Sequence, residues 1–303
     1  MFACSLPCIW DVYFLLGISL VCLSRSAFKK FKEWVPDDTP LSAQAVEAEG
    51  LVKRYETTYA LSGLSFIVKP GEIYGLLGPN GSGKTTTIKI ISALLQPTAG
   101  KIRVLGLDPG TDPVAVKAKI GYVPENPTLY DSLSPREFFE FVVSVRRLDD
   151  EAAGARVARL VDAFDMGEYY DSPISALSMG TKQKVTIIAS LIHEPRLLLM
   201  DEPLNGLDAK SSRILKEIML YHTERGGSVL FSTHIMEVAE NVCHRIGIIY
   251  QGKIMAEGNM AELRDLAGRQ GATLEEVFLK LTHEESEVRD TVRTLREAFG
   301  AAP

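Results

Sequence analysis

A glycine-rich run that ends in a lysine and three threonines is the stretch of this chain best suited to chemistry. It reads LLGPNGSGKTTT over residues 76–87, so Gly78, Gly83, Lys84 and Thr85 follow the spacing Gly, four residues, Gly-Lys-Ser/Thr. Glycines let backbone N–H groups point inward, where a Cβ atom would keep phosphate oxygens away. Lys84 can then place its charge on the β- and γ-phosphates, and the Thr85 hydroxyl can bind Mg²⁺. We therefore predict a P-loop that binds a nucleoside triphosphate.

An acidic pair is the second group of residues with a chemical use. Asp201 and Glu202 directly follow the apolar run LLLM at residues 197–200. A carboxylate at the end of such a strand can hold Mg²⁺ through its water shell. Phosphoryl transfer to water also requires a group that orients or deprotonates the nucleophile. We assign the first role to Asp201 and the second to Glu202.

The elements that must position these residues alternate between strands and helices. The apolar run 73–77 before the P-loop predicts a strand, and residues 85–91 after it can open a helix. The run 197–200 is apolar throughout, as expected for a strand buried on both faces of a parallel sheet. Further strands are predicted at 45–51, 64–68, 101–105, 228–232, 246–250 and 253–256, and helices from Ser134 onward and at 152–164, 211–222 and 237–243. This alternation predicts an α/β fold with ligands at the carboxyl ends of the strands.

Composition limits the class of protein. The 303 residues are 46% apolar and 24% charged, which is ordinary for a globular chain. The net charge of −6 gives no support to non-specific binding of nucleic acid. Three of the four cysteines, Cys4, Cys8 and Cys22, lie near the start, and only Cys243 lies in the body of the chain. With no Cys-x-x-Cys pair, this usage indicates a reducing compartment.

The first 42 residues form an apolar leader and a linker. Residues 6–23 are mostly apolar, and Arg25, Lys29, Lys30 and Lys32 follow them. This run just reaches the length needed to span a bilayer, and its flanking charges would leave the rest of the chain in the cytoplasm. Two interpretations stay open: a membrane anchor, or a leader that is not native to the protein, for instance because the start codon was assigned too far upstream.

The far end of the chain is charged and amphipathic. Helices are predicted around 274–281 and 284–299, and their pattern favours a solvated appendage. The chain is thus expected to divide into a leader and linker (1–42), a nucleotide-binding domain (43–263) with a helical subdomain at about 126–190, and a C-terminal helical extension (264–303).

Three further motifs make the resemblance to a known family specific. Residues 177–184, LSMGTKQK, look like the signature motif of ATP-binding cassette (ABC) proteins, and residues 204–208, LNGLD, look like the D-loop of that family. Residues 232–234, Ser-Thr-His, resemble its switch histidine. The resemblance covers about residues 43–263. It implies an α/β fold with a P-loop NTPase core on a mainly parallel sheet, an N-terminal antiparallel β subdomain and an inserted α-helical subdomain.

The resemblance also assigns roles to residues. Tyr55 is expected to stack on adenine, and the signature is expected to contact ATP that is bound by a second copy of the chain. The residues that bind ATP in the same chain are then Tyr55, Gly78, Asn80, Gly81, Ser82, Gly83, Lys84, Thr85 and Thr86. The signature residues that act on the second copy are Ser178, Met179, Gly180 and Thr181.

The same resemblance assigns catalysis to Glu202 and His234. It places Asp208 in the D-loop. The Mg²⁺ ligands would be Thr85, Glu125 and Asp201. Two features depart from the family pattern. Glu125 stands where the family usually has Gln, the residue that links ATP to the membrane partner, and Met179 and Thr181 replace the commoner Gly and Gln.

The function that the resemblance implies is ATP hydrolysis coupled to membrane transport. Two cassettes, expected to form a homodimer, would close on ATP and Mg²⁺ and move a separate transmembrane permease, with the chain peripheral at the cytoplasmic face of the membrane. The runs around Glu125 and the signature look closest to cassettes of bacterial exporters. The alternative is a soluble ABC ATPase that acts on nucleic acid or the ribosome. A second cassette, long coiled-coil insertions and a basic surface are missing from the sequence, so we expect no nucleic-acid partner.

Overall fold

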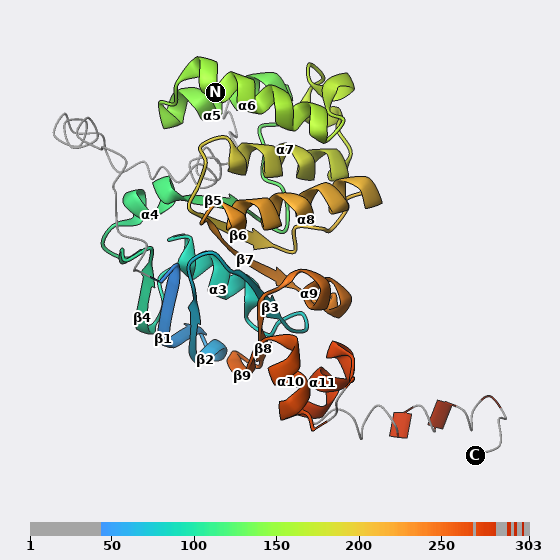
Figure 1. Ribbon diagram of the computed structural model, residues 1–303. Coiled ribbons are helices and arrows are strands. Elements are labelled where there is room, and N and C mark those ends of the chain that lie inside the picture. Colours follow the sequence, from blue (N-terminus) through green and yellow to red (C-terminus); the bar gives the residue numbers. More distant parts are fainter. Residues whose placement is uncertain (1–43, 269–270, 283–289, 292–293, 296–298, 300–303) are drawn as a thin grey trace, which may run out of the picture.

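The computed structural model describes residues 44–268, 271–282, 290–291, 294–295 and 299. The predicted anchor at 6–23 and the linker lie outside the described residues, as does most of the helix predicted at 284–299. The described chain contains two sheets and a set of helices around them (Figure 1).

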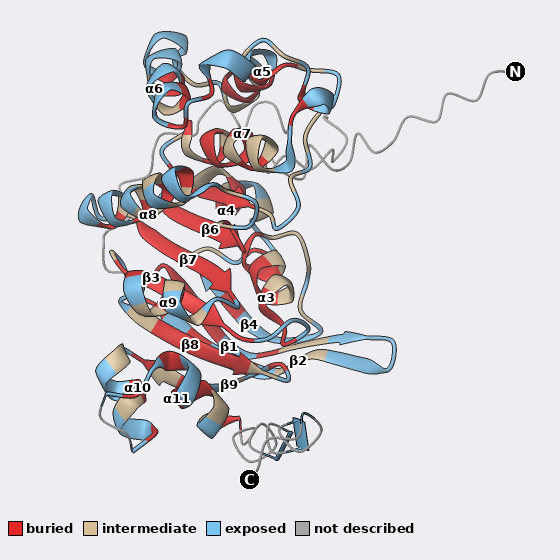
Figure 2. Cartoon of the chain, turned by 90° about the vertical axis from the view of Figure 1, so that its right-hand side faces the viewer, coloured by how far each residue is buried: buried red, intermediate tan, exposed pale blue. Residues whose placement is uncertain are grey.

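The central sheet has six strands in the order β5-β6-β7-β3-β8-β9. The strands are parallel apart from β9, which pairs antiparallel with β8. Most of their residues are buried, as the continuous apolar runs predict (Figure 2). The bounds are β3 (Ile73–Leu77), β5 (Ile120–Val123), β6 (Leu197–Asp201), β7 (Ser228–Thr233), β8 (Arg245–Tyr250) and β9 (Lys253–Gly258).

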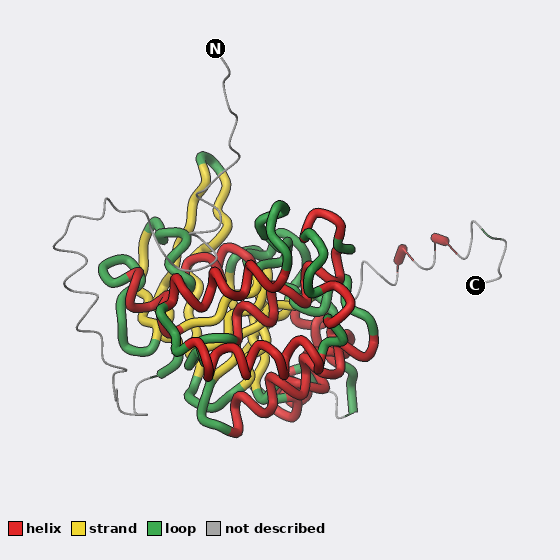
Figure 3. The backbone as a smooth tube through the Cα atoms, turned by 90° about the horizontal axis from the view of Figure 1, so that it is seen from above, coloured by secondary structure: helices red, strands yellow, loops and turns green. Residues whose placement is uncertain are grey.

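The second sheet is antiparallel, with the order β2-β1-β4. Its strands are β1 (Val46–Tyr55), β2 (Thr58–Val68) and β4 (Ala99–Val104). The far end of the β1–β2 hairpin is exposed and projects from the body of the molecule (Figures 2 and 3). Together with the helices, these two sheets confirm the predicted fold class: a mainly parallel α/β core, an antiparallel β subdomain and inserted helices.

Nine α-helices and two short 3₁₀ turns complete the described chain. The helices are α3 (Lys84–Ile91), α4 (Pro113–Lys119), α5 (Pro135–Arg146), α6 (Asp150–Ala163), α7 (Met179–Leu191), α8 (Ala209–Glu224), α9 (Met236–Val242), α10 (Met260–Leu266) and α11 (Leu274–Leu281). The 3₁₀ turns are η1 (Gly167–Tyr169) and η2 (Ile174–Ala176). Within the described residues, no helix combines the length and the apolar character that crossing a membrane requires.

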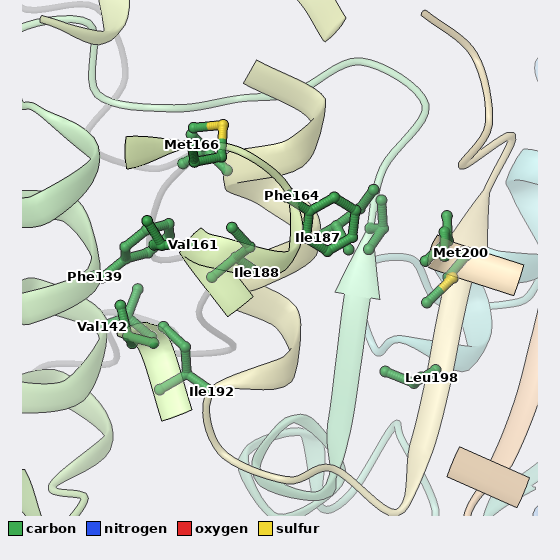
Figure 4. Packing of buried hydrophobic residues seen from close by; sticks show 14 of the residues in the cluster. Phe139, Val142, Val161, Phe164, Met166, Ile187, Ile188, Ile192, Leu198 and Met200 are labelled. Atoms are coloured by element: carbon green, nitrogen blue, oxygen red, sulfur yellow. The ribbon is translucent and has the colours of Figure 1, made fainter. Parts of the chain in front are cut away.

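Helices α5, α6 and α7 form a layer that shares one hydrophobic cluster with strands β3, β5, β6 and β7 of the central sheet. Phe139 and Val142 of α5 meet Val161 of α6 and Ile188 of α7, and the cluster continues to Met200 of β6 (Figure 4). Ser134 starts α5 as the sequence predicts, because its side chain accepts from Glu137 N while the Glu137 carboxylate accepts from Ser134 N. The packing orients α7, and with it the predicted signature, relative to the sheet.

The C-terminal helices differ from the sequence-based prediction. Leu274, Val277 and Phe278 of α11 are buried in a cluster with Leu77 of β3 and Ala239 of α9. The expectation of a solvated appendage is therefore wrong for residues 274–281, because their apolar face has a partner. Helix α10 was not predicted at all. The domain boundaries stay a prediction.

Candidate functional site

The glycine-rich loop lies between β3 and α3, and two of its glycines are required by close contacts. A Cβ atom on Gly78 would lie 2.2 Å from the Ile249 carbonyl oxygen, and one on Gly83 would lie 2.7 Å from the Ala60 carbonyl oxygen. Gly83 also has a φ of 112°, in the region that favours glycine. The loop is thus packed against β8 at Gly78 and against β2 at Gly83.

Lys84 is the buried cation of this loop. Its ammonium donates to the carbonyl oxygens of Gly78 at 2.7 Å and Pro79 at 3.1 Å. Nearby, the buried Ser82 hydroxyl has no hydrogen-bond partner among the described residues. A buried hydroxyl without a partner and a buried lysine at the start of a helix form a donor set that suits phosphate oxygens. The residues present therefore fit the predicted nucleotide.

Asp201 ends β6 within reach of the first turn of α3. Its carboxylate accepts a hydrogen bond from the Ser232 hydroxyl at 2.6 Å and is hydrogen-bonded by the Thr85 side chain. Burial raises the pKa of this carboxyl, and the bonds from Ser232 and Thr85 oppose that rise. Thr85 and Asp201 thus offer adjacent oxygen atoms, which are the ligands that Mg²⁺ prefers.

Glu202 is buried and has an unusual backbone. Its φ of 47° lies in the left-handed region, and its N–H donates to the Ser232 hydroxyl at 3.0 Å. Its Oε1 lies 3.5 Å from the Lys84 ammonium and 3.0 Å from Nδ1 of His234. Neither approach has hydrogen-bond geometry, so Oε1 is left without a hydrogen-bond partner among the described residues. Such a backbone has an energetic cost and is typical of functional sites.

Ser232 was not predicted as a site residue. Its hydroxyl donates to Asp201 and accepts from the Glu202 N–H, so one side chain from β7 orients both acids of β6. The strand it lies in, SVLFST at residues 228–233, is polar only at its ends, and Ser232 lies two residues before the predicted His234. A buried hydroxyl at such a position needs partners, and the neighbouring strand supplies them.

Glu125 is exposed, two residues beyond the end of β5. Val123 pairs with Met200, so Glu125 and Glu202 stand the same number of residues past the last pair of neighbouring parallel strands. This register brings Glu125 to the edge of the sheet where Asp201 ends. Burial is the main cause of the raised pKa of Tyr122, and the charges of Asp201 and Glu125 add to it.

The predicted signature begins α7 and lies against the predicted D-loop. Ser178 caps the helix by accepting from Thr181 N at 3.2 Å, and Met179 is 59% exposed. A Cβ atom on Gly180 would lie 2.3 Å from the Gly206 carbonyl oxygen. The segment therefore packs against the D-loop through Gly180, with a further contact from Lys182 to Asp131, and Met179 at its start stays exposed.

Comparison with known proteins agrees with this geometry. The sequence profile of the ABC transporter family matches residues 61–205. The chain is 35% identical over 241 residues to the ABC-type transporter ATP-binding protein EcsA of Bacillus subtilis, and the match covers 80% of this chain and 98% of EcsA. The chain belongs to the ABC transporter family.

Other members of the family match over different lengths. The cassette is 34% identical over 242 residues to the probable multidrug ABC transporter ATP-binding protein YbhF of Escherichia coli, covering 79% of this chain but 42% of YbhF. A solved ATP-binding subunit of an ABC transporter superposes with a TM-score of 0.75 at 33% identity, covering 78% of this chain and 99% of that structure. The dimeric structure of the cassette MJ0796, in a post-hydrolysis state bound to ADP and Pi, superposes with a TM-score of 0.66 at 25% identity. The match covers 71% of this chain and 98% of MJ0796. The ABC family and its nucleotide-binding, ATP-hydrolysing fold are thus shown for this chain.

In this cassette, Lys84, Thr85, Asp201, Glu202 and His234 come together, whereas two predicted parts of the site do not join them. The signature lies on the D-loop instead, as described above. Tyr55 ends β1 on the projecting hairpin, where the residue is 47% exposed and Lys53 Nζ lies 5.3 Å from the ring centre. Its stacking on adenine stays a prediction.

Asp208 of the cassette caps α8 and gives a prediction on stability. It accepts from Ser211 N at 2.7 Å and lies 3.0 Å from the Lys184 ammonium. The hydrogen bond from the Ser211 N–H, followed by that from Lys184, holds the pKa of this carboxyl well below its usual range. We expect Asp208→Ala to lower the free energy of unfolding at neutral pH by about 1 kcal/mol, the usual value of an N-cap.

The pH dependence follows from the lowered pKa. Stabilisation by such a carboxylate is complete above its unfolded pKa and is lost as the pH falls towards its folded pKa. Urea unfolding should therefore show a constant difference between parent and variant above about pH 5, and a shrinking one below about pH 4. A difference that grows as the pH falls would contradict the assignment. Asp162→Ala, on the exposed face of α6, is the control.

Proposed function

We propose that this chain is the ATP-binding and hydrolysing subunit of an ABC exporter whose permease is a separate protein. The observation that carries the proposal is the division of the site. Lys84, Asp201 and Glu202 converge at the edge of the central sheet, whereas the signature around Met179 is exposed on another surface. A second copy, placed head to tail, would supply its signature to this site and receive the first copy's signature in return.

Each group then has a role in hydrolysis. The backbone and Lys84 bind the phosphates, Thr85 and Asp201 hold Mg²⁺, and Glu125, past the end of the neighbouring strand β5, is the third proposed ligand. Glu202 orients the attacking water and accepts its proton, while His234 keeps the Glu202 carboxylate in place. Mg²⁺, when bound, would neutralise charge on the phosphates. These assignments are supported by the chemistry and positions of the side chains, with ATP and Mg²⁺ as the expected ligands.

The closed dimer would act on its partner by differential binding. ATP contacts both copies only when they are closed, so its binding favours closure and hydrolysis reverses it. We propose that this movement drives a permease at the cytoplasmic face of a membrane. The similarity to YbhF, a probable multidrug ABC transporter protein, supports an exporter of small molecules, and the dimeric structure of MJ0796 supports the pairing of two copies.

Co-purification tests the proposal. The full chain would be expressed with its native genomic neighbours, tagged and recovered after gentle solubilisation of membranes. We expect a polytopic membrane protein in the complex and ATPase activity that requires Mg²⁺. Recovery with ribosomes or nucleic acid, and without a membrane protein, would support the soluble alternative instead. The same tag on an unrelated protein is the control for non-specific capture.

A further inference from the structure

The C-terminal helices lie beneath the segment that carries His234. Helix α11 packs on α9, which follows His234 directly in the chain (Figure 1). Their shared cluster joins Ala239 of α9 to Leu263 of α10 and Leu274 of α11, and it extends to Leu77. Leu77 is the last residue before Gly78 of the P-loop, so the cluster that contains residues of α10 and α11 also includes a residue next to the P-loop.

Helix α9 depends on this packing for its position. It has seven residues, and its N-cap Ile235 provides no side-chain hydrogen bond. Helices of this length are unstable on their own and take their position from tertiary contacts. Ala239 is fully buried in the cluster, and Met236, two residues after His234, packs against it. The orientation of the loop before α9 is therefore set partly by α10 and α11.

One carboxylate joins the three helices. Oε1 of Glu240, on α9, accepts from Nη2 of Arg264 at 2.6 Å, and its Oε2 accepts from the N–H of Leu274 at 3.4 Å. Arg264, on α10, also donates from Nε to the Ala272 carbonyl oxygen at 2.7 Å. The Arg264 and Glu240 side chains are 33% and 27% exposed, so the solvent screens this pair only in part.

The contact between Glu240 and α11 is not needed to begin that helix. Thr273 and Glu276 already form a capping box at its N-terminus. A second carboxylate at the same place adds little to the start of α11 but fixes α9 relative to it. The pair Glu240–Arg264 is therefore placed to set the position of α9 and of the histidine before it.

We propose that α10 and α11 form a brace that holds His234 beside Glu202 through α9, with Glu240 and Arg264 as positioning residues for hydrolysis. The proposal rests on the function proposed above for His234 and Glu202. The brace sets the distance between the His234 ring and the Glu202 carboxylate, so loosening it should slow the chemical step more than it weakens nucleotide binding.

The first test is Arg264→Gln in the full chain. We expect kcat for ATP hydrolysis to fall roughly 3- to 10-fold, while KM changes by less than about twofold, since the P-loop is untouched. Arg264→Lys keeps the charge and should recover part of the rate. The matched control is Arg213→Gln, which removes an exposed ion pair with Glu217 on α8 and should leave kcat unchanged. An unchanged kcat in Arg264→Gln would overturn the proposal.

A double-mutant cycle separates positioning from a general loss of structure. If Arg264 acts through His234, Arg264→Gln should cause no further loss of rate in a His234→Ala background, measured over single turnovers. If the double variant instead lost rate by the product of the two single fold-losses, Arg264 would act on hydrolysis by a route that does not involve His234. That result would contradict the brace even if both single variants were slow.

Hydrogen exchange gives a measurement that does not need activity. Within α9, the Ala239 N–H donates to the Ile235 carbonyl oxygen. At the end of the helix, the Cys243 N–H donates to the Ala239 carbonyl oxygen. We expect both to exchange faster in Arg264→Gln than in the parent, with no change in α8. If the parent chain hydrolyses no ATP, the proposed function fails, while exchange still decides whether α10 and α11 hold α9. Unchanged exchange at both amides would overturn the brace.

Discussion

Glu202→Gln is expected to lower kcat for ATP hydrolysis about 100-fold or more, the usual contribution of a general base. Glutamine keeps the shape of the side chain but cannot accept a proton from water. The Glu202 carboxylate is well placed for that role, because it is buried, is within 3.5 Å of the Lys84 ammonium and has an Oε1 without a hydrogen-bond partner in the described chain. The measurement is steady-state phosphate release with saturating ATP and Mg²⁺.

Nucleotide binding should survive the same change. Removing a negative charge beside the phosphates favours retention of ATP, so Glu202→Gln should accumulate the ATP-bound dimer on size exclusion while the parent returns to monomer. Glu217→Gln, on the exposed face of α8, is the matched control and should behave as the parent. A Glu202→Gln variant with normal kcat would remove the proposed catalytic role of Glu202.

The sequence predicted the parts of the site whose signal is local. The P-loop spacing and the apolar run before Asp201 each depend on a few adjacent residues, and β3, α3 and β6 lie where these patterns place them. The start of α5 was predicted for the same reason, since a capping box is a contact over three residues. Local chemistry determines such features, so a single sequence can show them.

Contacts between distant segments could not be predicted in this way. Ser232 orients Asp201 and Glu202 only because β6 and β7 are neighbours with one particular register. The left-handed φ of Glu202 could not be predicted from the sequence, because glutamate does not favour that backbone conformation. Gly180 is required by the Gly206 carbonyl oxygen, 26 positions further along the chain. Each of these depends on tertiary packing, which the pattern of one sequence does not contain.

One strand was not predicted and the surroundings of one helix were predicted wrongly, both for physical reasons. The missed strand, β5, has four residues and directly follows α4, so it is too short to show a period of its own. The charged surface of α11 suggested an appendage, but its apolar stripe is as wide as that of a packed helix and meets Leu77 and Ala239. The amphipathic pattern was recognised, and the partner that covers it was not.

Lys84→Ala should weaken ATP binding about 30- to 1000-fold, the range for removing one partner of a close charged contact. Lys84 carries the positive charge of the buried part of the loop, at 5% exposure, and it reaches the carbonyl oxygens of Gly78 and Pro79. Binding of a fluorescent ATP analogue to the purified chain measures the loss. Lys89→Ala, in the last turn of the same helix, is the control and should bind as the parent does.

The same substitution should also destabilise the folded chain, and this separates two explanations of a binding defect. Alanine leaves the buried Glu202 carboxylate without the ammonium 3.5 Å away, at a cost on the order of 1 to 3 kcal/mol. In a Glu202→Gln background that charge is absent, so Lys84→Ala should cost less stability, while the loss of ATP affinity should remain. If affinity instead returned in the double variant, the lysine would act by neutralising Glu202 rather than by binding phosphate. Unchanged affinity in Lys84→Ala alone would contradict the P-loop assignment.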